Sequence, residues 1–307
     1  MLAASGLAAP SQAQLARTFV SAASGSDGNN CDRPTPCRTF QHAHDNTLAN
    51  GEITVLDPGG YGSVTITKAI SIINDGVGEA GTLVSGGGNG VTVNATATDA
   101  VSLRGLTIKG IGFGGGNGIV FNNGKSLTVE SCVIRSHVGA APLGNGVVLQ
   151  PNADGSFAAT DTLVADNHNS GILVRPTGGA VDAVISRAEA YRNNNGIVID
   201  GSQSTGTVAG ALADSLLGGN AFGLVVNSAT GQAPTQVVAT RMAVANNGTG
   251  VAVGLAGTAS LRIGQSSVTG NAHGWQIVTG GFLESYGDNM VDGNTADQGP
   301  MSLISTK

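Results

Sequence analysis

The fold is decided by a stretch near the middle of the chain, Gly171-Ile172-Leu173-Val174, which returns one period later as Gly196-Ile197-Val198-Ile199. Both copies place a glycine before three apolar residues. The same unit begins at seven further glycines: Gly90, Gly118, Gly146, Gly223, Gly250, Gly274 and, in degraded form, Gly299. The interval between successive glycines is nearly constant along this series. Because a fixed period of roughly 20–50 residues is typical of stacked units, the chain is predicted to be a repeat protein.

Each period contains several short apolar segments, and these leave too few residues for a helix. Between Gly223 and Gly250 the segments are 224–226, 236–239 and 242–244. A propeller blade needs about 40–45 residues, and the consensus of a leucine-rich repeat is absent. Strands of three to five residues between Gly, Asn and Ser turns indicate a β-solenoid. The sequence therefore predicts an all-β, single-stranded right-handed parallel β-helix, with roughly nine to ten coils over residues 51–307.

A column of asparagines supports the stacking. Asparagine stands three residues before the repeat glycine at Asn193, Asn220, Asn247 and Asn271. Asparagine tolerates the left-handed backbone of a tight corner, and stacked amides can hydrogen-bond from coil to coil. Asn167 is one residue out of phase, so we expect His168 in the column and a slightly different corner in that coil.

Composition excludes several classes of protein. The chain has 307 residues, 49 of them glycine, and only 11% are charged. With 14 Lys and Arg against 20 Asp and Glu, nucleic acid is not an expected partner. No stretch of about 18 uninterrupted apolar residues occurs, so no transmembrane helix is expected.

The N-terminal residues indicate an exported protein. Residues 1–16 are small and apolar and offer two small-x-small endings, which predicts the remnant of a secretory signal peptide. A structureless apolar N-terminus is the alternative. The expected location is secreted or periplasmic.

The three cysteines are predicted to play structural roles. Cys31 and Cys37 flank a short proline-containing loop, which predicts a disulfide. A zinc site is the alternative, and only His42 and His44 lie near enough in sequence to complete it. Cys132 lies in an apolar run and is expected to be an unpaired core residue. No cofactor or resident metal is expected.

In its repeat and in its N-terminal segment, the chain resembles the pectin-lyase-like superfamily of right-handed parallel β-helices. The N-terminal passages Thr18-Phe19-Val20-Ser21, Gly25-Ser26-Asp27-Gly28 and Pro36 to Ala43 share in the likeness. The resemblance implies a first strand, a loop and a capping helix over residues 17–50. The pattern of residues 39–49 agrees, with Thr39 as N-cap and Phe40, Ala43 and Leu48 on one apolar face. The histidines in this helix, His42 and His44, are expected on its polar rim.

The repeat also predicts which side chains point outward. After each repeat glycine the first and third residues should face the core and the second should face outward. The outward column is mostly apolar: Val120, Val148, Leu173, Val198, Val225, Ala252 and Gln276. Either a loop covers this stripe, or the stripe is a docking surface for a partner or for self-association.

Charged residues concentrate in the middle coils. Arg175 and Asp200 each follow a core strand by one residue, and they are one period apart, so one should lie above the other. A surface salt bridge is one interpretation and a polysaccharide site is the other. The candidate catalytic residues are Arg175, Asp200, Arg187 and Glu189, and the candidate binding residues are Asp161, His168, Tyr191 and Arg192. His273, beside the expected core residue Trp275, is a further weak candidate.

Two hypotheses for function follow. The first is an exported, non-catalytic β-helix that binds polysaccharide or a component of the cell envelope. The second, favoured by the resemblance, is a polysaccharide lyase, glycoside hydrolase or epimerase acting on polymers of the uronic-acid type, with calcium expected only for a lyase. No paired carboxylates and no intact catalytic motif are visible, and fold alone does not assign an activity. A trimeric fibre module would need assembly elements, and no heptad repeat is present.

Overall fold

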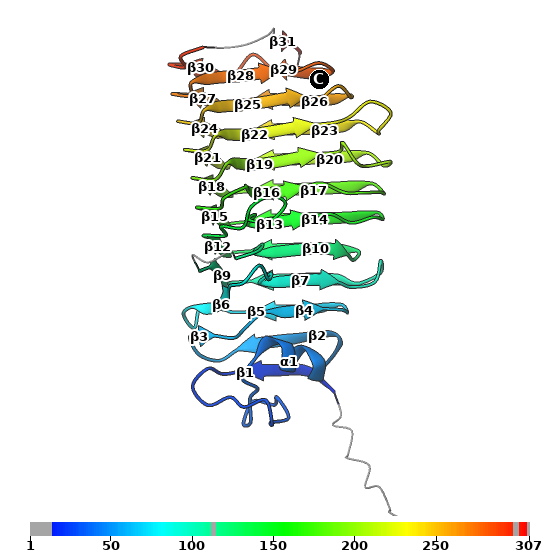
Figure 1. The fold of residues 1–307 in the computed structure, drawn as a ribbon, viewed down its shortest axis with the longest axis vertical. Coiled ribbons are helices and arrows are strands. Elements are labelled where there is room, and N and C mark those ends of the chain that lie inside the picture. The colour runs from blue at the N-terminus through cyan, green and yellow to red at the C-terminus, as the bar shows by residue number, and fades with distance from the viewer. Residues whose placement is uncertain (1–13, 112–114, 297–300, 306–307) are drawn as a thin grey trace, which may run out of the picture.

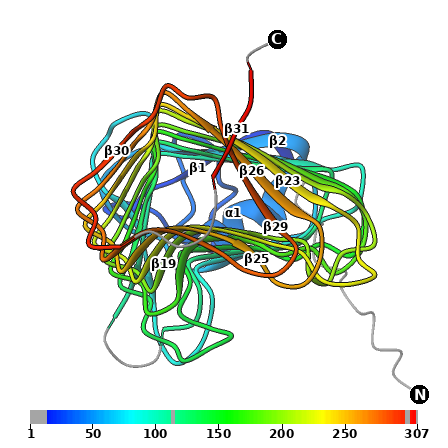
Figure 2. The same cartoon turned by 90° about the horizontal axis from the view of Figure 1, so that it is seen from above.

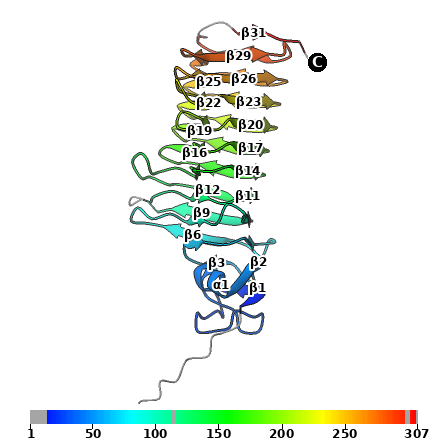
Figure 3. The same cartoon turned by 90° about the vertical axis from the view of Figure 1, so that its right-hand side faces the viewer.

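The computed structural model of the chain describes residues 14–111, 115–296 and 301–305. These residues form an elongated stack of coils whose strands run across the long axis (Figures 1 and 3). Most of the predicted signal remnant, residues 1–13, and the degraded repeat at Gly299 lie outside the described residues. Seen along the axis, the wall of the solenoid encloses one continuous interior (Figure 2).

Three parallel sheets form the wall of the solenoid. Within the described residues, sheet A has twelve strands, in spatial order β1 (Leu15–Val20), β2 (Thr47–Val55), β5 (Ile70–Ile73), β8 (Ala100–Arg104), β11 (Ser126–Glu130), β14 (Gly155–Thr160), β17 (Val181–Ser186), β20 (Val208–Ala213), β23 (Thr235–Thr240), β26 (Ala259–Gly264), β29 (Gly281–Ser285) and β31 (Ser302–Leu303). Sheet B has β3 (Gly59–Gly60), β6 (Ala80–Val84), β9 (Leu106–Gly110), β12 (Val133–Arg135), β15 (Leu163–Ala165), β18 (Glu189–Tyr191), β21 (Leu216–Gly218), β24 (Ala243–Ala245), β27 (Ser267–Thr269) and β30 (Met290–Asp292). Sheet C has β4 (Val64–Ile66), β7 (Val91–Asn94), β10 (Ile119–Asn123), β13 (Val147–Leu149), β16 (Ser170–Val174), β19 (Asn195–Asp200), β22 (Phe222–Asn227), β25 (Thr249–Gly254) and β28 (His273–Ile277).

The repeat glycines lie where neighbouring coils approach most closely. A Cβ atom added to Gly196 would lie 2.6 Å from the carbonyl oxygen of Gly223, and one added to Gly223 would lie 2.5 Å from that of Gly250. None of these three has a positive φ. Close packing between coils, rather than a left-handed backbone, therefore requires glycine here.

The predicted asparagine ladder is present at the corner between sheets B and C. Each side-chain amide donates to the Oδ1 atom of the next coil, at 2.9 to 3.2 Å, along the series Asn167, Asn193, Asn220, Asn247, Asn271 and Asn294. The expectation that Asn167 stands outside the column was wrong, because the additional residue of that coil follows the asparagine. The left-handed residue is also not the asparagine but the one before it, as in Asp166 (φ 58°) and Arg192 (φ 54°).

The N-terminal segment closes one end of the solenoid as predicted. Cys31 and Cys37 form a disulfide with a Cα–Cα distance of 4.6 Å. The capping helix α1 (Phe40–Asn46) begins after Thr39, whose hydroxyl accepts from the backbone N–H of His42 at 3.2 Å. The helix is shorter than predicted, because Leu48 already belongs to β2 and is exposed.

Two further side chains are buried. His44 was expected on a polar rim but is buried, with Nδ1 3.0 Å from Asp45 and Nε2 accepting from the backbone N–H of Thr67. Desolvation lowers the pKa of His44. Cys132 is buried and unpaired as predicted, and burial raises its thiol pKa to about 11.

No helix among the described residues is long and apolar enough to cross a bilayer.

Candidate functional site

The outward apolar stripe of sheet C is buried by the chain itself. Val120, Val148, Leu173 and Val198 stand in register on four successive strands and are only 3–7% exposed. They form a small cluster separate from the main core, with Val225 packed against its end. Because these residues are already covered, no partner is needed to bury them. Self-association through the stripe stays a prediction.

A second row of polar side chains borders the stripe, directly before the repeat glycines. Asn145 Nδ2 donates to Asn117 Oδ1 at 2.9 Å, the backbone N–H of Ser170 donates to Asn145 Oδ1 at 3.0 Å, and Asn195 Nδ2 donates to Ser170 Oγ at 3.3 Å. These bonds run from coil to coil. The row gives the stripe a rigid polar edge along the solenoid.

A loop over residues 136–146 overhangs this edge. It contains the cis peptide bond Ala141–Pro142 and is fastened by Asn145 Nδ2, which donates to the carbonyl of Pro142 at 2.9 Å. The side-chain amide of Asn169 donates to the carbonyl of Leu143. Figure 2 shows cyan and green loops extending outward from the solenoid wall near β19. The loop therefore forms one wall of a recess over sheet C.

The recess, here called the sheet C groove, has a volume of about 220 Å³. Leu173 and Val198 form its apolar floor. The other side chains around it are mostly polar, and the lining residues are Ala141, Pro142, Asn145, Asn169, Ser170, Arg175, Asn195 and Asp200. Both central candidates from the sequence, Arg175 and Asp200, therefore lie in one groove.

Arg175 differs from most arginines of the solenoid. Of the seven arginines from residue 51 onward, five form ion pairs with acidic residues of a neighbouring coil or turn: Arg104, Arg187, Arg192, Arg241 and Arg262. Within the described part of the chain, Arg135 and Arg175 form none. Arg175 and Asp200 follow the paired residues Val174 and Ile199, yet their charged atoms are not within 4.0 Å. Asp200 is 9% exposed and accepts from the backbone N–H of Ser202 at 3.0 Å.

The other charged candidates bind to one another and not into the groove. Arg187 pairs with Asp161 and Arg192 pairs with Asp166, each at 2.6 Å. Hydrogen bonds from these guanidinium groups lower the pKa of both aspartates. Arg192 also stacks over the ring of Tyr191 at 4.7 Å. These pairs hold adjacent coils together on the outer corners of the solenoid.

Glu189 and His168 also lie outside the groove floor. Glu189 lines a shallow depression of about 390 Å³ on sheet B, together with Asp161 and Arg187. His168 is exposed and lies beside Gly144 at the foot of the overhanging loop. Sequence reasoning missed the loop and Asn169. The interval from Gly118 to Gly146 is longer than the next one, from Gly146 to Gly171, and this is the signal that could have located the loop.

Comparison with known proteins identifies the fold. No protein-family profile matches the chain, and no curated protein matches it. Pectate lyase Pel9A is 14% identical and has a TM-score of 0.53, over 92% of this chain and 78% of that one. The enzymatically active domain of tailspike protein 2 from bacteriophage CBA120 is 13% identical and has a TM-score of 0.60, over 86% of this chain and 43% of that one. This likeness confirms the right-handed parallel β-helix fold.

Proposed function

We propose that the protein is an exported, non-catalytic β-helix that binds an acidic polysaccharide in the sheet C groove. The observation that carries the proposal is the unpaired guanidinium of Arg175 beside a row of amides and above an apolar floor. Planar guanidinium groups bind carboxylates through two parallel hydrogen bonds. Arg175 would bind a uronate carboxylate, because no acidic side chain among the described residues forms an ion pair with its guanidinium group.

The remaining groups of the groove suit the rest of a sugar ring. Amides donate and accept hydrogen bonds, so Asn169 and Asn195, which each use one N–H within the protein, match hydroxyl groups, whereas Asn145 is occupied by the loop and the polar row. Leu173 and Val198, which are 7% and 6% exposed, leave a narrow apolar strip on the groove floor for the C–H groups of the ring. The volume of about 220 Å³ lies below the roughly 300–1,000 Å³ of typical small-molecule pockets. The groove would therefore hold one unit of a polymer that continues along the solenoid.

An enzymatic role on the same polymers is the alternative, and the two similar structures belong to proteins named as enzymes. Glycoside hydrolysis requires two carboxyl groups flanking the scissile bond. Among the described residues that line the groove, Asp200 is the one carboxylate. A lyase or epimerase requires a base, and because a guanidinium keeps its proton in proteins, Asp200 would have to be that base in this groove. Calcium binds through six to eight oxygen ligands, which one carboxylate and three amides would supply poorly.

The disulfide supports export. Cys31 and Cys37 are joined in a short loop, and such bonds persist in oxidising compartments and are rare in the cytosol. A secreted or periplasmic location would place the protein where acidic polysaccharides occur. This location is part of the proposal.

A panel of uronic-acid polymers, with and without calcium, tests the proposed function. Binding is measured by titration calorimetry, and turnover by the appearance of new reducing ends or unsaturated uronate. The wild type is expected to bind without turnover. Arg175→Ala should bind about 10- to 100-fold more weakly, because a hydrogen bond to a charged group contributes about 1.5–3 kcal/mol. Arg241→Ala, which removes a corner ion pair with Asp214, is the control. Turnover that Arg175→Ala abolishes would refute the non-catalytic function.

A further inference from the structure

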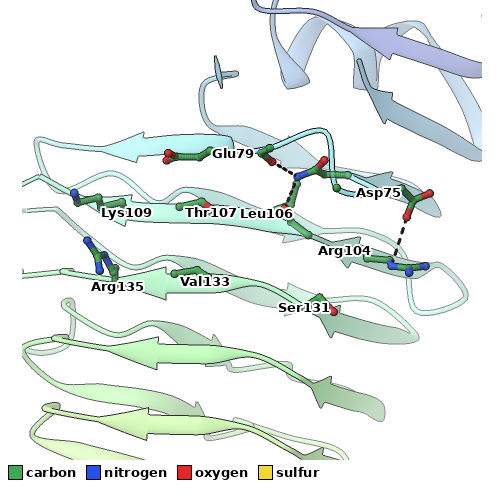
Figure 4. A pocket seen from close by; sticks show the side chains of 13 residues that line it. Asp75, Glu79, Arg104, Leu106, Thr107, Lys109, Ser131, Val133 and Arg135 are labelled. Atoms are coloured by element: carbon green, nitrogen blue, oxygen red, sulfur yellow. Dashed lines mark hydrogen bonds and ion pairs between the residues drawn. The ribbon is translucent and has the colours of Figure 1, made fainter. Parts of the chain in front are cut away.

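A second and larger groove lies on the outer face of sheet B, closer to the N-terminal end (Figure 4). It is lined by β9 and β12, by Arg104 at the end of β8, and by the turn over residues 74–79 that precedes β6, and its volume is about 900 Å³. We call it the sheet B groove. It faces a different side of the solenoid from the sheet C groove, and none of the residues considered so far as a site lines it.

Two cations are stacked in this groove. Lys109 on β9 and Arg135 on β12 are direct partners in the parallel register, so their backbones are about 4.8 Å apart. Figure 4 shows both side chains at the same end of the groove. Like charges directly opposite each other on neighbouring strands are destabilising. Neither forms an ion pair within 4.0 Å in the described part of the chain.

The neighbours of this pair neutralise it only in part. The adjoining positions of the same column are Leu83 and Ala165. Asp166, next to Ala165, is engaged by Arg192 through two hydrogen bonds of 2.6 and 3.1 Å, and Arg135 adds a weaker electrostatic contribution to lowering its pKa. Unbalanced positive charge is therefore concentrated here, in a chain with a net charge of −6.

The arrangement departs from the rule of the rest of the solenoid. Elsewhere, with the exception of Arg175, the arginines of the solenoid pair with an acid of a neighbouring coil or turn, as in Arg187 with Asp161, Arg241 with Asp214 and Arg262 with Glu284. At the position of Lys109 an acid would have produced the same pattern. The stacked cations instead match a ligand that brings its own negative charge.

The other lining groups narrow the class of ligand. The hydroxyls of Thr107 and Ser131 make no hydrogen bond to other described residues and face the groove. Arg104 is balanced by Asp75 at 3.6 Å and Glu130 at 3.8 Å. Glu79, whose carboxylate lies over Gly81, would repel a densely charged polyanion such as nucleic acid. A ligand with sparse acidic groups and many hydroxyls fits this distribution.

We propose that the sheet B groove is a second binding site for acidic oligosaccharide, with Lys109 and Arg135 holding one acid group between them. This inference stands on its own geometry and does not require the sheet C groove to bind. Together, two sites on different faces would allow one molecule to hold two polymer chains.

The test is titration calorimetry of the full chain with a galacturonate oligomer, with a neutral galactose oligomer as the reference ligand. The wild type is expected to bind two acidic oligomers, and the double variant Lys109→Ala, Arg135→Ala one. Lys125→Ala, an exposed lysine outside the groove, is the matched control and should keep both. Equal binding of the neutral oligomer, or unchanged stoichiometry and affinity in the double variant, would overturn the proposal.

Two more variants separate the explanations. Arg175→Ala should lose one binding event and retain the one at the sheet B groove. If it loses all binding while the double variant loses none, the sheet B proposal fails and the sheet C proposal stands. If it changes nothing while the double variant loses a site, the reverse holds. Lys109→Glu should form an opposite-charge pair with Arg135, raise the melting temperature and still abolish this site, which distinguishes loss of binding from loss of folding.

Discussion

Substitution of Asn220 by alanine tests how the coils are held together. Four hydrogen bonds join this side chain to its neighbours: Nδ2 donates to Asn247 Oδ1 and to the carbonyl of Ala190, and Oδ1 accepts from the backbone N–H and Nδ2 of Asn193. In the variant, Asn193 Nδ2 keeps its bond to Val164. The backbone N–H of Asn193 loses its partner, whereas the carbonyl of Ala190 loses the bond from Asn220 but stays in the parallel ladder between β18 and β21.

The size of the effect follows from the backbone N–H of Asn193. A buried polar group left without a partner costs about 1–3 kcal/mol, so Asn220→Ala should lower the free energy of unfolding by at least about 1–3 kcal/mol. Asn122→Ala is the matched control, because Asn122 forms the same kind of amide bonds between coils, to Asn94 and Gln150, at the surface. Its cost should stay within about 0.5 kcal/mol.

Urea unfolding followed by circular dichroism measures both variants, and hydrogen exchange of the Asn193 amide gives a local readout. Asn220→Ala should lower the unfolding midpoint strongly and speed exchange at Asn193. Equal midpoints for the Asn220 and Asn122 variants would refute the reasoning, because burial would then not determine how much the asparagine hydrogen bonds contribute to stability.

Two further predictions concern single positions in the coils. Gly196→Ala should prevent stable folding, because its Cβ would lie 2.6 Å from the Gly223 carbonyl oxygen. Gly218→Ala is the control: its Cβ would lie 3.4 Å from the Ala245 carbonyl oxygen, so this variant should melt near the temperature of the wild type. Equal melting temperatures for the two variants would contradict this prediction. Burial lowers the pKa of His137 to about 4 from 6.5, so the unfolded chain binds the extra proton between these values and stability falls as pH drops from about 6.5 to 4, by about 3 kcal/mol. His137→Asn should remove that part of the pH dependence in unfolding experiments at pH 4 and 7, and an unchanged pH dependence would count against it.

The repeat made the fold predictable because each coil reuses the same contacts. Gly196 stands where the coils touch, so the requirement for glycine returns with every period. The inward and outward alternation around Val198 follows from strand geometry alone, and the stacking of Arg175 near Asp200 follows from their separation by one period.

Features outside the repeat could not be predicted in the same way. The loop at residues 136–146 belongs to one coil, so no second copy indicates that it folds over Leu173. The place of Asn167 in the ladder depends on which side of the asparagine the additional residue lies, and spacing counted from the glycine does not show it. Arg187 and Arg192 were predicted as site residues because charged residues cluster near them in the sequence. In the structure they form ion pairs with Asp161 and Asp166, one coil away.

The measurement that most directly tests the proposed function is the affinity of wild type and Arg175→Ala for a galacturonate polymer, with turnover recorded in the same samples. The double variant Lys109→Ala, Arg135→Ala serves as the background for both, so that only the sheet C groove is reported. We predict binding without turnover, weakened about 10- to 100-fold by the loss of Arg175. Equal affinity of the two proteins, or turnover that depends on Arg175, would contradict the proposal.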